Sequence, residues 1–120
     1  MPINLSREGD VFVLRFDDGE NRFRPDNLAD WHAALDEVEQ AGTPAALVTT
    51  GSGRFYSNGL DLEWMLTQAG GPEREEYIPA VLGLMARILV FPTITVAALN
   101  GHAFGAGAQI SLAHDYRVMR

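Results

Sequence analysis

Two glycine-containing loops each follow an apolar run of strand-forming residues and lead into a segment with helical spacing, one over residues 50–61 and the other over 99–108. Backbone N–H groups at the start of a helix have no intrahelical acceptor and lie at the positive end of the helix dipole, so they bind anions. Two such loops from neighbouring strands would direct two N–H groups at one developing negative charge, as in an oxyanion hole. The alternative is that these glycines only make tight turns.

Other chemical signatures are missing from the sequence. The glycines at 51, 53 and 59 do not fit G-x-G-x-x-G, the chain has no lysine for a phosphate-binding loop, and no G-x-S-x-G motif supplies a serine nucleophile. The absence of cysteine excludes disulfides, thiolate metal sites and a cysteine nucleophile. No spacing of ligand residues indicates a metal site, and we expect none.

Composition limits the classes of partner. The 120 residues are 47% hydrophobic, which is enough for one core and argues against disorder. The net charge of −7, with arginine as the sole strongly basic residue type, disfavours nucleic acid and anionic membranes. The long uncharged stretch over residues 88–113 is interrupted by proline and polar residues, so it predicts buried core rather than a membrane span. The N-terminus lacks the basic segment followed by an apolar segment that marks a signal peptide, so we expect a cytoplasmic protein.

The periodicity of apolar residues predicts an α/β chain. Strands are expected over 3–7, 11–16, 45–50, 94–99 and 116–119, with the first two forming a hairpin. Helices are expected over 28–38, from about Asp61, over 77–88 with Pro79 in its first turn or kinking it, and after Ala106. Residues 51–59 are expected to form a flexible loop. The alternation of strands and helices predicts a mostly parallel sheet in which 45–50 and 94–99 are neighbours.

Residues 55–65 (FYSNGLDLEWM) and 100–109 (NGHAFGAGAQ) resemble the two oxyanion segments of the enoyl-CoA hydratase/isomerase (crotonase) superfamily. Residues 20–25 (ENRFRP) lie where that family has its first coenzyme A contact loop. The resemblance covers the whole chain. It implies a crotonase-like fold of repeated ββα units, with residues 1–120 as the N-terminal part of one domain. It also implies an acyl-CoA thioester substrate, with no cofactor apart from the coenzyme A of that substrate.

The resemblance implies roles for individual residues. The oxyanion donors would be the backbone N–H groups of Leu60 and Ala106; the family often has glycine at the second position, and alanine fits there only with a negative φ. The residues expected to contact acyl-CoA are Asn58, Gly59, Asp61, Leu62 and Gly105, with Asn21, Arg22 and Phe23 on the nucleotide side. Asp61 could instead cap a helix. Arg22, Arg24 and Arg54 are candidates for a coenzyme A phosphate, or ordinary exposed arginines.

Gln109 occupies the position of the first catalytic glutamate of family hydratases. An amide cannot exchange a proton at neutral pH, so hydration is disfavoured, and the chain is most similar to the subgroup that isomerises 3-enoyl-CoA to 2-enoyl-CoA. In that subgroup a single catalytic glutamate follows soon after the position of Arg120, in a chain about twice this length. Two alternatives stay open, namely a catalytically silent fragment or paralogue, and a hydratase-like lyase, hydrolase or decarboxylase. The family implies a homo-oligomer, a trimer or hexamer, and association with a C-terminal half.

Overall fold

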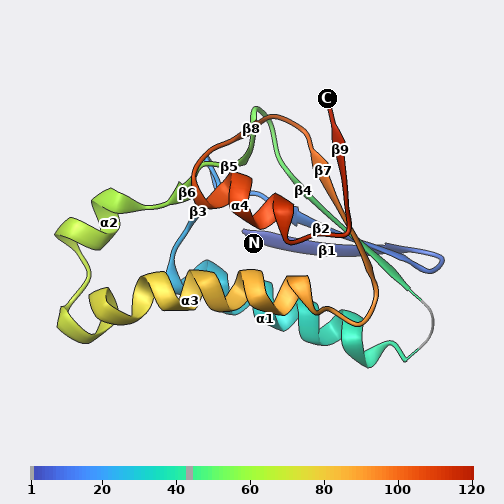
Figure 1. The fold of residues 1–120 in the computed structure, drawn as a ribbon, viewed down its shortest axis with the longest axis horizontal. Helices are drawn as coiled ribbons and strands as arrows, with labels where there is room; N and C mark the ends of the chain where they lie inside the picture. The colour runs from blue at the N-terminus through green and yellow to red at the C-terminus, as the bar shows by residue number, and fades with distance from the viewer. Residues whose placement is uncertain (1, 43–44) are drawn as a thin grey trace.

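The computed structural model describes residues 2–42 and 45–120, and a five-stranded sheet runs through them (Figure 1). The strands are β1 (Ile3–Glu8), β2 (Val11–Phe16), β4 (Ala46–Gly51), β7 (Ile94–Leu99) and β9 (Tyr116–Met119), in the order β1-β2-β4-β7-β9. The β1–β2 hairpin is antiparallel and every other pairing in this sheet is parallel. The predicted hairpin and the predicted pairing of the strands at 45–50 and 94–99 are both confirmed.

Two long helices cover one side of this sheet. Helices α1 (Pro25–Gln40) and α3 (Gly71–Leu89) lie side by side along it (Figure 1). Each helix buries one apolar stripe, because residues three or four positions apart lie on the same face. The buried stripes contain the expected residues, which are Leu28, Trp31, Leu35 and Val38 in α1 and Tyr77, Val81, Leu84 and Ile88 in α3.

Helix α3 begins earlier than the sequence predicts. It starts at Gly71, so Pro79 lies in the helix interior rather than in the first turn. Proline has no N–H, and the carbonyl of Glu75 therefore lacks its usual intrahelical donor. Both residues are exposed, so water can hydrogen-bond this carbonyl. A second proline, Pro72, lies in the first turn of the helix, where it costs no hydrogen bond.

Short strands replace the flexible loop expected at 51–59. Strand β5 (Phe55–Ser57) pairs in parallel with β8 (His102–Ala103), and β3 (Arg22–Phe23) pairs in parallel with β6 (Gly59–Leu60). A strand of two or three residues is too short to show the alternation that marks longer strands. Each partner is also distant in sequence, so no local pattern indicates these pairings.

Two short helices follow the small strands. Helix α2 (Leu62–Thr67) begins after β6 and extends away from the main sheet, whereas α4 (Ala106–Leu112) begins shortly after β8 and packs on β5, β6 and α3 (Figure 1). Both helices therefore start where the sequence places the two glycine loops. Among the described residues, none of the helices is both long and apolar enough to cross a membrane.

Candidate active site

The two glycine loops are in direct backbone contact. A Cβ atom built on Gly59 would lie 2.8 Å from the Ala106 nitrogen and 2.8 Å from the Phe104 carbonyl oxygen. The Phe104 N–H donates to the Ser57 carbonyl over 3.0 Å, which ties the second loop to the first. Gly59 has φ +83, a conformation that favours glycine. The residue immediately before Leu60 thus lies against the Ala106 amide.

The Ala106 amide is the first of helix α4. Gly105 precedes it as the helix N-cap, with φ 53 and ψ −122, and the next amide, that of Gly107, donates to the Phe104 carbonyl over 2.8 Å. Within residues 2–42 and 45–120, the Ala106 N–H has no acceptor in hydrogen-bond geometry, as expected for a first-turn amide. Asn21 is the one described non-glycine residue with positive φ, so the negative φ required of Ala106 is confirmed.

Leu60 lies in β6, opposite Phe23 of β3. Its carbonyl accepts a hydrogen bond from Arg22 Nη1 at 3.1 Å, and the next amide, that of Asp61, donates to the Tyr77 hydroxyl at 2.9 Å. The same hydroxyl donates to the Phe23 carbonyl. The segment that ends the first loop is therefore held by side chains from β3 and α3.

Asp61 caps helix α2. Its Oδ1 accepts the Trp64 N–H at 3.0 Å, and its Oδ2 lies 3.2 Å from Arg24 Nη1 in an ion pair. The capping role that the sequence allowed is thus present, with an added ion pair that no local pattern indicates. Leu62, the first residue of α2, is 53% exposed.

The predicted coenzyme A contact loop is joined to the first glycine loop through Glu20. Its carboxylate accepts hydrogen bonds from Asn58 Nδ2 at 2.8 Å and Arg22 Nη2 at 2.9 Å, and its carbonyl accepts the Asn58 N–H at 3.0 Å. These two side-chain hydrogen bonds, from Asn58 first, lower the pKa of Glu20. Loops that are distant in sequence thus form one connected surface.

The candidate phosphate-binding arginines differ in their surroundings. Arg24 pairs with Asp18 as well as Asp61, and Arg22 pairs with Glu20. Arg54 is exposed. The guanidinium groups of Arg22 and Arg24 are already engaged with carboxylates, and a phosphate contact by any of the three arginines stays a prediction.

Asn21 has a structural role that the sequence did not reveal. It is fully buried, its Nδ2 donates to the Phe55 and Tyr56 carbonyls at 3.1 and 3.2 Å, and its carbonyl accepts the Ser57 hydroxyl at 2.7 Å. Phe23 is also fully buried. Their predicted contact with coenzyme A stays a prediction, and in this structure both side chains are occupied inside the protein.

A family model described as enoyl-CoA hydratase/isomerase matches residues 6–120. The chain belongs to the enoyl-CoA hydratase/isomerase family. Over 122 residues it is 39% identical to "Enoyl-CoA delta isomerase 2, peroxisomal" of Arabidopsis thaliana, covering 97% of this chain and 51% of that protein. It is 34% identical to a putative enoyl-CoA hydratase of Thermus thermophilus, covering 93% of this chain and 46% of the relative. The chain therefore spans about half the length of these curated relatives.

Solved structures of the family confirm the crotonase-like fold. A probable enoyl-CoA hydratase from Mycobacterium tuberculosis superposes with a TM-score of 0.89 at 30% identity, covering 98% of this chain and 49% of that one. An enoyl-CoA hydratase from Bacillus anthracis gives a TM-score of 0.90 over 99% of this chain and 47% of its own, although only 20% of residues are identical, and so supports the fold alone. The Arabidopsis relative carries the word peroxisomal in its name, and a cytoplasmic location for this chain stays a prediction.

Gln109, which the resemblance aligns with a catalytic glutamate, is exposed. Gln109 lies on α4 one turn after Gly105, whose carbonyl accepts the Gln109 N–H at 3.0 Å. Two other carboxylates have structural or surface positions. Asp115 accepts hydrogen bonds from the Thr95 N–H and hydroxyl. Glu63 is exposed in the first turn of α2. In the part of the chain that the structure describes, no three histidine, aspartate or glutamate residues are grouped to hold a metal.

A histidine outside the predicted site is buried beside it. The His114 ring lies 2.8 Å from the Thr49 hydroxyl through Nε2 and 2.8 Å from the Ile110 carbonyl through Nδ1. Burial lowers the pKa of His114. These contacts tie the end of α4 to the centre of the sheet, which is a structural role.

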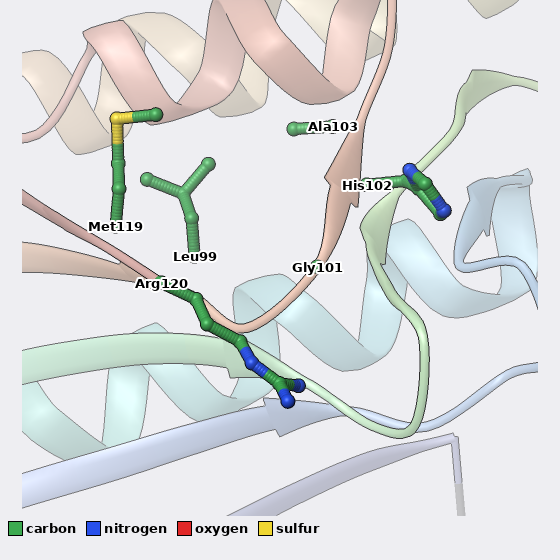
Figure 2. A pocket seen from close by; sticks show the side chains of 6 residues that line it. All are labelled: Leu99, Gly101, His102, Ala103, Met119 and Arg120. Carbon is green, nitrogen blue, oxygen red and sulfur yellow. The ribbon is translucent and has the colours of Figure 1, made fainter.

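An open cavity lies at the carboxyl ends of β7 and β9, the edge of a parallel sheet where ligands gather in α/β folds. It has a volume of about 360 Å³ and is lined by Leu99, Gly101, His102, Ala103, Met119 and Arg120. Leu99 and Met119 are register partners, and their side chains point the same way into this space (Figure 2). The lining is mostly apolar, and the Arg120 side chain points the opposite way from those of Leu99 and Met119 (Figure 2).

Proposed function

We propose that the protein containing this chain isomerises 3-enoyl-CoA to 2-enoyl-CoA. The Leu60 and Ala106 N–H groups would stabilise the thioester enolate formed on the way. The observation that carries the proposal is the contact between Gly59 and the Ala106 nitrogen, which brings the two loops together. Relatives at 39% and 37% identity that are named enoyl-CoA delta isomerases support the same chemistry.

The proposed reaction moves one proton. A base removes a proton from C2, and the electron pair delocalises onto the thioester oxygen to form an enolate. The two N–H groups donate to that oxygen, and each such donor typically lowers the barrier by about 3 kcal/mol. Return of the proton at C4 shifts the double bond from C3–C4 to C2–C3, so water is neither added nor released.

Isomerisation is favoured over hydration because of Gln109. Adding water across a double bond needs two carboxylates to hold and activate the water, and Gln109 stands at the position of one of them. The carboxylates of Asp115 and Glu63 do not replace it, since one is engaged by Thr95 and the other is exposed on α2. We expect the single base to be a glutamate that follows Arg120 in the full-length protein.

A conjugated 2-enoyl thioester absorbs where its unconjugated 3-enoyl isomer does not, so isomerisation can be followed directly. We expect the full-length protein to convert 3-enoyl-CoA in this assay. Substituting the expected glutamate by glutamine should abolish turnover while acyl-CoA affinity changes little, because the backbone donors remain. Binding of acyl-CoA without turnover by the unmodified protein would instead identify a catalytically silent paralogue.

A trimer or hexamer is also part of the proposal, as is association with the second half of the domain. Sedimentation of the full-length protein measures the oligomer, and a monomer at micromolar concentration would contradict this part.

A further inference from the structure

The peptide unit that joins Leu60 to Asp61 is held at both ends by side chains. Its carbonyl, on Leu60, accepts a hydrogen bond from Arg22 Nη1 at 3.1 Å. Its N–H, on Asp61, donates to the Tyr77 hydroxyl at 2.9 Å. Arg22 belongs to β3 and Tyr77 to α3, so both contacts come from outside the loop that they hold.

The Tyr77 hydroxyl joins the ends of two paired strands. It accepts from Asp61 directly after β6, and it donates to the Phe23 carbonyl at the end of β3. Tyr77 is 1% exposed, and its ring packs on Trp64 with a centroid separation of 5.1 Å. Burial raises the pKa of Tyr77, so the hydroxyl keeps its proton at neutral pH and can donate.

The Leu60 N–H belongs to the planar Gly59–Leu60 peptide unit, which shares the Leu60 α-carbon with the Leu60–Asp61 unit. Its direction therefore depends on how both units are held. The preceding unit is set by the close approach of Gly59 to the Ala106 nitrogen. The following unit is set by Arg22 and Tyr77. Loss of either contact would free rotation about the Leu60 α-carbon, and a donor misplaced by about 1 Å can cost up to about 100-fold in rate.

We propose that Tyr77 is a positioning residue, which aligns the Leu60 N–H with the thioester oxygen by holding the Leu60–Asp61 peptide unit, and that Arg22 holds the other end of this unit. This inference rests on the proposed function. It assigns Tyr77 no contact with substrate, and it predicts that its hydroxyl affects the enolate-forming step more than substrate binding.

The sharpest test compares two buried tyrosines in the full-length protein. Tyr77→Phe removes the hydroxyl and keeps the ring. Tyr56→Phe is the matched control, because Tyr56 is 3% exposed and its hydroxyl bonds to Thr49 at 2.8 Å, a contact that does not involve Leu60. We expect Tyr77→Phe to lower kcat for 3-enoyl-CoA by about tenfold, less than the roughly 100-fold loss on removal of a whole donor. We expect KM within about twofold of the unmodified value, and for the control both parameters within about twofold.

A second variant keeps the proposal testable if Tyr77→Phe does not fold. Arg22 is 38% exposed at its side chain, and Arg22→Met removes its hydrogen bond to the Leu60 carbonyl. A fall in kcat supports positioning, whereas a rise in KM alone identifies Arg22 as a coenzyme A contact and overturns its part of the proposal.

The outcomes distinguish the positioning role of Tyr77 from the proposed isomerase activity. If the unmodified protein isomerises 3-enoyl-CoA but Tyr77→Phe matches Tyr56→Phe in kcat, the positioning role is wrong and the proposed function stands. If the unmodified protein shows no isomerisation, the proposed function fails and the positioning role fails with it.

Discussion

The α-carbon of Gly107 lies directly against the carbonyl of Ser57. A Cβ atom at Gly107 would stand 2.1 Å from the Ser57 oxygen, closer than real Cβ atoms approach any heavy atom. Together with the approach of Gly59 to the Ala106 nitrogen, this contact holds the two glycine loops directly against each other. A side chain at Gly59 or Gly107 would collide with the opposite loop, so both positions require glycine. Gly59 also requires it because its φ is positive.

Gly107→Ala should therefore separate the loops. We expect it to lower the free energy of unfolding by about 1–3 kcal/mol, the usual cost of overpacking, and to reduce isomerase kcat. The control is Gly83→Ala, the same atomic change in helix α3 at a position with open space, which should raise stability by about 0.5–1 kcal/mol. Urea unfolding and kcat measure both variants. Equal stability and activity of Gly107→Ala and the unmodified protein would contradict the structural account.

The long elements could be predicted from sequence because each carries a local signal. The hairpin follows from Glu8-Gly9-Asp10 between two β-prone runs, and the buried stripe of α1 follows from the spacing of Leu28, Trp31, Leu35 and Val38. The start of α3 differs from the sequence prediction because Pro79 resembles a helix boundary, although it lies on an exposed interior turn. The interior position is tolerated there because water can satisfy the freed carbonyl.

The candidate site was only partly predictable. The two loops carry their own glycine signal, but the side chains that hold them are separated from them in sequence. Tyr77 was expected only as an apolar residue on a helix face, because nothing near it indicates that its hydroxyl meets Phe23, 54 positions away. For Asn21 a weak signal existed, since asparagine tolerates the positive φ that follows an Asp-Asp-Gly turn.

Substitutions at Asp61 should separate its two roles. Asp61→Asn keeps an oxygen to cap helix α2 and removes the charge that faces Arg24, whereas Asp61→Ala removes both. We expect Asp61→Ala to be less stable than Asp61→Asn by about 1 kcal/mol, the usual value of an N-cap. Thermal unfolding of both variants measures the difference. Equal stability would show that the cap contributes nothing here.

Acid should destabilise the protein in part through His114. Burial lowers its pKa in the folded state, so below the unfolded value of 6.5 the unfolded chain binds more protons than the folded one. This contribution to stability is therefore lost as pH falls below about 6.5, by at most about 1.4 kcal/mol per pH unit. His114→Gln should lose less stability than the unmodified protein between pH 7 and pH 5 in urea unfolding. An identical slope for both would show that His114 does not contribute.

Gln109→Glu tests why the proposed reaction is isomerisation. Gln109 is exposed on α4, so we expect the substitution to change stability by less than about 0.5 kcal/mol. A second carboxylate would then be available to hold a water, and we expect 3-hydroxyacyl-CoA among the products. The matched control is Gln109→Ala, which adds no carboxylate and should form none. If neither variant forms 3-hydroxyacyl-CoA, the residue at position 109 does not decide between isomerisation and hydration.

Isomerase activity is tested most directly by measuring how 3-enoyl-CoA is divided between two products. The full-length protein is incubated with 3-enoyl-CoA, and 2-enoyl-CoA and 3-hydroxyacyl-CoA are separated by chromatography at several times. A single base and two oxyanion donors predict 2-enoyl-CoA with no net hydration. Formation of 3-hydroxyacyl-CoA at a rate comparable to isomerisation would contradict the isomerase assignment and favour a hydratase.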